Sequence, residues 1–237
     1  MSHADQRENI HQHSGWLIPA VFLCVIVALS GLFLGWYLRP GPKPAALPTD
    51  KSNQVRMKIH NLVFAIPANY IQNSATRSGG EQESVALAAL FPSWLGYSDA
   101  TARLFAGNAP DSPVIRLLLH TDSNPLNADT RLERIYRPYI REASGAPGFF
   151  GLTKYSFAAD SGYEDNELLA GADGKGLVLF LCERPSPELP SPNCLSPDRP
   201  LGKTVSYSYR FKRAYLARWP EISAGVQSLI AHFRSKN

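Results

Sequence analysis

The sequence of 237 residues lacks the short motifs that carry a recognisable chemistry. It contains no Gly-x-Ser-x-Gly elbow, no Walker-type phosphate loop, no Gly-x-Gly-x-x-Gly turn after an expected strand and no His-Glu-x-x-His pair. Those motifs mark an activated serine, a nucleotide site and a zinc site. We therefore assign no catalytic residue, no metal ligand and no cofactor from the sequence, and we favour a binding protein over an enzyme.

The net charge is also small, and cysteines are few. The 24 Lys and Arg residues against 20 Asp and Glu leave a net charge of only +4, so we do not expect nucleic acid as a partner. Three cysteines exclude a small scaffold built on many disulfides. His3, His11 and His13 lie in a polar tail, which we interpret as solvated filler and not as a metal site.

What the sequence does have is one long apolar run, from Trp16 to Leu38, without Asp, Glu, Lys or Arg. As a helix this run would extend roughly 34 Å, enough to cross the hydrocarbon core of a bilayer. Trp16 at one end and Trp36 at the other suit the two membrane interfaces. We predict a polar tail over 1–15 and a transmembrane helix over 16–38 in contact with lipid.

A cleaved signal peptide and a buried core helix are the alternatives for this run. A signal peptide has a positive n-region and a small-residue cleavage site, whereas Arg7 is accompanied by Asp5 and Glu8, and the run ends at Tyr37-Leu38. A core helix of this length would carry a polar stripe, which is absent. We therefore expect the helix to be retained as an anchor.

Gly31 and Gly35 form a small-xxx-small step inside this run. Such a step lets two membrane helices approach closely, so Gly31 and Gly35 are a candidate face for a homodimer. The alternative is that they reflect only the frequency of glycine in membrane helices.

The remainder divides into a linker and a globular part. Residues 39–56 are rich in proline and poor in large apolar groups, which predicts an extended spacer. Residues 57–237 alternate between apolar strand candidates and turn signals and end in an amphipathic segment. We predict an α+β fold, in which a mainly antiparallel sheet follows the transmembrane helix and a C-terminal helix packs on the sheet.

Local patterns locate most of these elements. We expect strands over 57–66, 84–91, 113–120, 152–158, 166–171, 176–182 and 204–212. The Asp-Gly step at 173–174 predicts a hairpin, and Val205 to Phe211 alternates between an apolar and a polar face. Pro220 suits the first turn of the C-terminal helix, and shorter helices are expected over 98–106 and 129–137.

Cys182 and Cys194 enclose a loop in which four residues are proline: Pro185, Pro187, Pro190 and Pro192. A disulfide at the base of this loop would join two strand ends and constrain it. The alternative is a pair of buried, reduced thiols. A rigid loop loses little entropy on binding, so these four prolines mark a candidate docking loop for a partner. The simpler alternative is a connection between two strands that the disulfide only stabilises.

Different features of the sequence favour opposite sides of the membrane for the C-terminal part. Basic residues lie mainly after the apolar run, at Arg39, Lys43, Lys51, Arg56 and Lys58. The positive-inside rule would therefore place the C-terminal part in the cytoplasm. A disulfide requires an oxidising compartment, and large domains translocate with less regard to charge. We favour a single-pass protein of the inner (cell) membrane with its C-terminal domain outside the cytoplasm.

A resemblance rests on three segments: IPANYI (66–71), FLCERP with PNC (180–194), and SYRF with LARWPEI (208–222). Through these segments the sequence resembles bacterial single-pass "transmembrane anchored" envelope proteins. The resemblance implies an anchor and an exported domain, and it carries over no catalytic residue. We expect a membrane-anchored, extracytoplasmic binding module of the bacterial envelope, with an envelope protein as its partner. The alternatives are a tethered hydrolase that uses His60 or His120, and a cytoplasm-facing subunit of a membrane complex.

Overall fold

The computed structural model describes residues 17–38 and 48–235. The chain forms two units, Met1–Lys43 and Pro44–Asn237, which are described separately. The first holds α1 (Leu17–Tyr37), the one helix in the described residues that is long and apolar enough to cross a membrane. The expected apolar helix is thus confirmed. Its retention as an anchor stays a prediction, and the tail over 1–15 lies outside the described residues.

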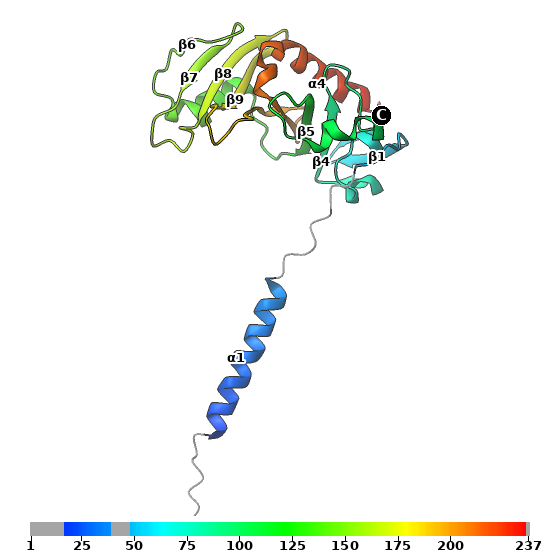
Figure 1. The fold of residues 1–237 in the computed structure, drawn as a ribbon, viewed down its shortest axis with the longest axis vertical. Coiled ribbons are helices and arrows are strands. Elements are labelled where there is room, and N and C mark those ends of the chain that lie inside the picture. The colour runs from blue at the N-terminus through cyan, green and yellow to red at the C-terminus, as the bar shows by residue number, and fades with distance from the viewer. Residues whose placement is uncertain (1–16, 39–47, 236–237) are drawn as a thin grey trace, which may run out of the picture. The chain divides into compact units, whose positions relative to one another are not determined.

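The second unit is built on an eight-stranded sheet whose neighbours are all antiparallel (Figure 1). In spatial order its strands are β4 (Ser84–Leu90), β5 (Val114–Thr121), β11 (Val205–Lys212), β10 (Asn193–Pro200), β9 (Gly176–Glu183), β8 (Asn166–Asp173), β7 (Thr153–Ser156) and β6 (Ala146–Pro147). The predicted α+β class and antiparallel sheet are confirmed.

A smaller sheet has the order β2-β1-β3, with β1 (Gln54–Ile59) antiparallel to β2 (Leu62–Pro67) and parallel to β3 (Gly80–Gln82). The expectation of one strand over 57–66 is wrong, because the chain reverses at His60 and Asn61. His60 adopts a φ of 49°, a left-handed conformation in which His and Asn are enriched.

The C-terminal helix α4 (Trp219–Phe233) lies along one face of the large sheet, as expected (Figure 1). Pro220 falls in its first turn. The short helices are α2 (Ala102–Ala106), α3 (Ala128–Arg131) and the turns η1 (Ala68–Tyr70), η2 (Ala75–Ser78), η3 (Asp99–Thr101), η4 (Leu132–Tyr136), η5 (Arg137–Tyr139) and η6 (Arg213–Arg218). Both predicted short helices are therefore present, each divided among turns of different pitch.

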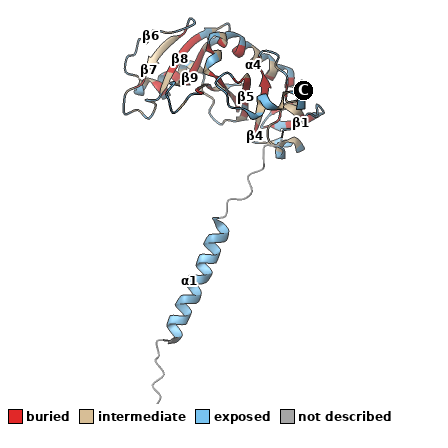
Figure 2. Cartoon of the chain, viewed as in Figure 1, coloured by how far each residue is buried: buried red, intermediate tan, exposed pale blue. Residues whose placement is uncertain are grey.

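The main core lies between α4, the small sheet and the inner face of the large sheet (Figure 2). Val205, Tyr207, Tyr209 and Phe211 of β11 all point into this core, as their alternation predicts. A second core forms on the outer face of β8 and β9, beneath Leu132 and Tyr136 of η4. Farther along the outer face, Leu118 of β5 and Leu195 of β10 are 39% and 38% exposed, so this middle region is open to solvent.

Candidate functional site

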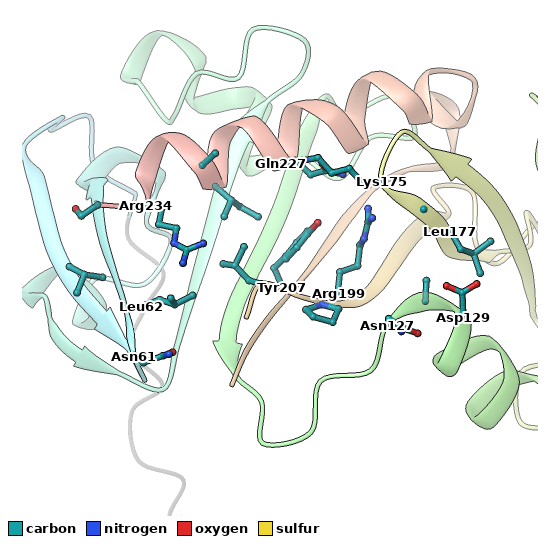
Figure 3. A pocket seen from close by; sticks show the side chains of 18 residues that line it. Asn61, Leu62, Asn127, Asp129, Lys175, Leu177, Arg199, Tyr207, Gln227 and Arg234 are labelled. Atoms are coloured by element: carbon teal, nitrogen blue, oxygen red, sulfur yellow. The ribbon is translucent and has the colours of Figure 1, made fainter. Parts of the chain in front are cut away.

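One cavity in the described residues is a groove of about 840 Å³ (Figure 3). Its walls come from elements far apart in the chain: the start of β2, α3, the β8–β9 hairpin, the ends of β10 and β11, and the last turns of α4. Lining residues include Leu62, Asn127, Lys175, Arg199, Tyr207 and Arg234. Figure 3 shows Arg199 and Tyr207 projecting side by side toward α4.

A partly buried polar network holds one wall of the groove. Asp173 Oδ2 accepts hydrogen bonds from Arg199 Nη1 at 3.3 Å, Ser223 Oγ at 2.9 Å and Gln227 Nε2 at 3.0 Å. The Lys175 backbone N–H donates to Asp173 Oδ1 at 2.9 Å. These bonds tie the β8–β9 hairpin to β10 and to α4, so the network holds this wall together.

Burial and charge set the protonation of this network. Burial raises the pKa of Asp173, but the hydrogen bonds from Lys175 and Ser223 and the charge of Arg199 lower it by more, so it lies below its usual value. Burial raises the pKa of Tyr207 to about 12, with Arg199 acting in the opposite direction. At neutral pH Asp173 is therefore a carboxylate, and Tyr207 keeps its proton and is a hydrogen-bond donor.

The groove offers binding chemistry. Lys175 and Arg234 are exposed lining residues, Asp129 lies on the same side of the groove as Lys175 (Figure 3), and Leu62 and Ile230 contribute buried apolar surface. Its described lining includes neither histidine nor cysteine. A mixture of apolar surface and few oriented polar groups suits recognition of a chain segment or a small ligand.

His120 lies outside this groove, in an ion-pair cluster on β5. Its Nε2 is 3.1 Å from Asp198 Oδ1 and its Nδ1 is 2.9 Å from the Thr121 carbonyl oxygen. Arg131 Nη2 is 3.7 Å from the other oxygen of Asp198. Burial lowers the pKa of His120, but its bonds to Asp198 and Thr121 raise it by more, so the pKa lies above its usual value. Because both ring nitrogens face acceptors, the geometry suits an imidazolium that joins β5 to β10 and α3.

His60, the other histidine considered for a hydrolase, is exposed in the β1–β2 turn. Its Nδ1 is 2.8 Å from Thr204 Oγ1, which also donates to Asn61 Oδ1 at 3.1 Å. Neither His60 nor His120 lines the large groove. The structure thus places the two histidines in structural contacts and does not bring them together.

Cys182 and Cys194 form the expected disulfide, with a Cα–Cα distance of 4.0 Å. They are direct partners in the register of β9 and β10, so the bond joins β9 to β10 and not to β11. Pro185, Pro187 and Pro190 are exposed in the enclosed loop, whereas Pro192 is buried.

A second contact holds the loop close to its base, where Ser191 Oγ donates to the Asn108 carbonyl oxygen at 2.9 Å. A docking role for the loop stays a prediction. A homodimer face at Gly31 and Gly35 also stays a prediction. A Cβ at either glycine would meet no atom within 4 Å in this single chain.

Sequence patterns do not identify the groove. Arg199 follows Pro197 and precedes Pro200, a context that argues against a central strand, yet β10 includes all three. A register shift between Ser196 and Arg199 accommodates the irregularity. Lys175 is the exception, since the Asp-Gly hairpin signal locates it at the tip of a turn.

Comparison with known proteins identifies a fold and no family. No family model and no curated protein matches the sequence. Smlt3025, an immunity protein of the Stenotrophomonas maltophilia type IV secretion system, superposes with a TM-score of 0.55 at 18% identity, over 84% of this chain and 100% of that one. The iron-regulated outer membrane lipoprotein FrpD of Neisseria meningitidis gives a TM-score of 0.37 at 10% identity, over 80% and 97%. At this level of identity, the likeness to Smlt3025 shows a shared fold.

Proposed function

We propose that the chain is an anchored binding protein of the bacterial envelope, with α1 in the inner membrane and the globular unit outside the cytoplasm. The observation that carries the proposal is the buried Cys182–Cys194 bond in a unit whose chain also holds the exposed apolar helix α1. Disulfides persist in oxidising compartments, and an apolar helix of this length is stable only within a bilayer or another apolar environment.

The partner we propose is a toxic effector protein, which the globular unit captures and neutralises. The fold shared with an immunity protein of a secretion system supports this choice. The groove supports it too, since it presents apolar surface beside Lys175, Tyr207 and Arg234. A hydrolase is less well supported, because His120 is held between two acceptors and His60 lies in an exposed turn.

A labelling experiment tests the location. Cys182 and Cys194 are 0% exposed, so a reporter cysteine is introduced as Asp160→Cys at an exposed turn, in a Cys24→Ala background. A membrane-impermeant maleimide applied to cells with a permeabilised outer membrane should label this cysteine. Labelling only after lysis of the inner membrane would place the unit in the cytoplasm, as the positive-inside count of basic residues suggests.

A protection experiment tests the function. Cells that lack the chain should lose viability when sibling cells deliver the effector, and the full chain should restore survival. Lys175→Glu with Arg234→Glu reverses two exposed lining charges and should weaken protection, whereas Arg134→Glu on η4, which does not line the groove, should not. Equal survival with and without the chain would rule out the immunity function.

A further inference from the structure

Two arginines face each other on the outer side of the large sheet. Arg116 on β5 and Arg210 on β11 are direct partners in the antiparallel register. Within the described residues neither guanidinium forms an ion pair or a hydrogen bond. Like charges placed directly opposite on neighbouring strands repel, so this pair opposes folding unless an anion lies between the two side chains.

A third cation adds to the same site. Lys212 lies two positions beyond Arg210 on β11 and is only 5% exposed. Its Nζ donates to Asn108 Oδ1 at 2.7 Å and to the Ser191 carbonyl oxygen at 3.0 Å, both of which are neutral oxygens. Burial lowers the pKa of Lys212, the charges of Arg210 and Arg116 act in the same direction and that of Glu183 acts in the opposite one, so an added anion would favour the charged ammonium.

The three cations line one polar pocket of about 260 Å³, together with Asn108 and Asn193. The carboxylate of Glu183 lines the adjoining groove and offsets part of this positive charge; its Oε2 accepts from the Asn193 backbone N–H at 2.6 Å and from Asn193 Nδ2 at 3.0 Å. Burial together with the Arg210 charge lowers the pKa of Arg116. The pocket is thus a preformed site for negative charge, which we call the anion pocket.

The anion pocket opens onto a strip of exposed sheet. A shallow groove of about 410 Å³ shares Arg116, Asn193 and Arg210 with the pocket and continues over Leu118 and Leu195. These leucines are more than one-third exposed. A free inorganic anion would not contact the apolar strip, whereas a peptide with an acidic side chain beside apolar ones would contact both the anion pocket and the strip.

We propose that the anion pocket binds an aspartate or glutamate side chain of the partner protein, whose flanking apolar residues lie over Leu118 and Leu195. The inference rests on the proposed function, because it states the chemistry of the partner segment. Two guanidinium groups can donate several parallel N–H bonds to one carboxylate, and the carboxylate cancels the repulsion between Arg116 and Arg210.

The test measures binding of the full chain in lipid nanodiscs to a fluorescent hexapeptide of alternating Leu and Glu. Arg210→Gln should reduce the affinity about tenfold or more, since it removes charge-assisted hydrogen bonds. Arg134→Gln removes the same charge from an exposed position on η4 and should leave the affinity unchanged. Arg116→Gln provides a second variant should Arg210→Gln fail to fold.

Thermal unfolding without peptide separates a binding role from a structural one. Removal of a repulsive charge should leave Arg210→Gln as stable as the wild-type chain or more stable, while a loss of stability would mean that the arginine supports the fold. Peptide affinity equal in wild type and Arg210→Gln, or inorganic phosphate binding as tightly as the peptide, would overturn the proposal. Peptide binding without protection of cells would instead contradict only the immunity function.

Discussion

Trp94 lies so close to Gly225 of α4 that a Cβ on the glycine would be 2.0 Å from Cζ2 of the indole. The loop after β4 fixes the tryptophan from two directions. The Trp94 backbone N–H donates to the Leu90 carbonyl oxygen at 2.6 Å, and Tyr70 Oη donates to the Trp94 carbonyl oxygen at 3.0 Å. The absence of a side chain at Gly225 is therefore what allows this loop to pack against α4.

We predict that Gly225→Ala destabilises the globular unit by about 1–3 kcal/mol, because the added methyl group must displace a constrained indole. The intrinsic preference of alanine for helices offsets only part of this cost. Denaturant unfolding measures the difference. Gly174→Ala serves as the control, since a Cβ there meets no atom within 4 Å. A variant at Gly225 more stable than wild type would contradict the packing argument.

The disulfide should contribute strongly to stability. Cys182 and Cys194 are separated by 12 positions, and closing a loop of this size stabilises a protein by about 3 kcal/mol in the chain-entropy treatment. We expect the double variant Cys182→Ala with Cys194→Ala to lose about this amount in unfolding experiments. Wild-type chain treated with a reductant under the same conditions should approach the same value. Unchanged stability after complete reduction would show that register pairing alone holds β9 to β10.

Elements with strong local chemistry could be predicted from the sequence. The Asp-Gly turn of the β8–β9 hairpin, the alternation in β11 and the proline-initiated helix α4 all follow from short-range preferences, and each is present. His60 and the proline-containing β10 were missed, because a left-handed non-glycine residue and a bulged strand are stabilised by tertiary contacts. The groove and the anion pocket depend on register between distant strands, which short-range patterns do not specify.

The polar network of the groove wall leads to a prediction at acid pH. Because the pKa of Asp173 is lowered by folding, its contribution is fully present above the usual value of 3.8 and is lost as pH falls through the lower folded value. Asp173→Asn should cost about 1–3 kcal/mol at pH 7, since it disrupts a partly buried network of hydrogen bonds. The difference from wild type should vanish at the lowest pH. Asp160→Asn, at an exposed turn, is the comparison variant.

The His120–Asp198 pair should give the opposite dependence on pH. The pKa of His120 is raised above its usual value of 6.5, so the pair stabilises the fold fully below 6.5 and loses this contribution as pH rises through the folded value. His120→Asn should therefore be less stable than wild type at pH 5.5, and the gap should narrow toward pH 9.

Unfolding free energies across this pH range measure the gap, and NMR titration of the imidazole reports the pKa directly. His232→Asn, on the exposed side of α4, is the comparison variant. If the gap at His120 widens as pH rises, the ring is neutral in the folded chain. That result would remove the argument that His120 is held as a cation between Asp198 and Thr121, and it would restore His120 as a candidate base.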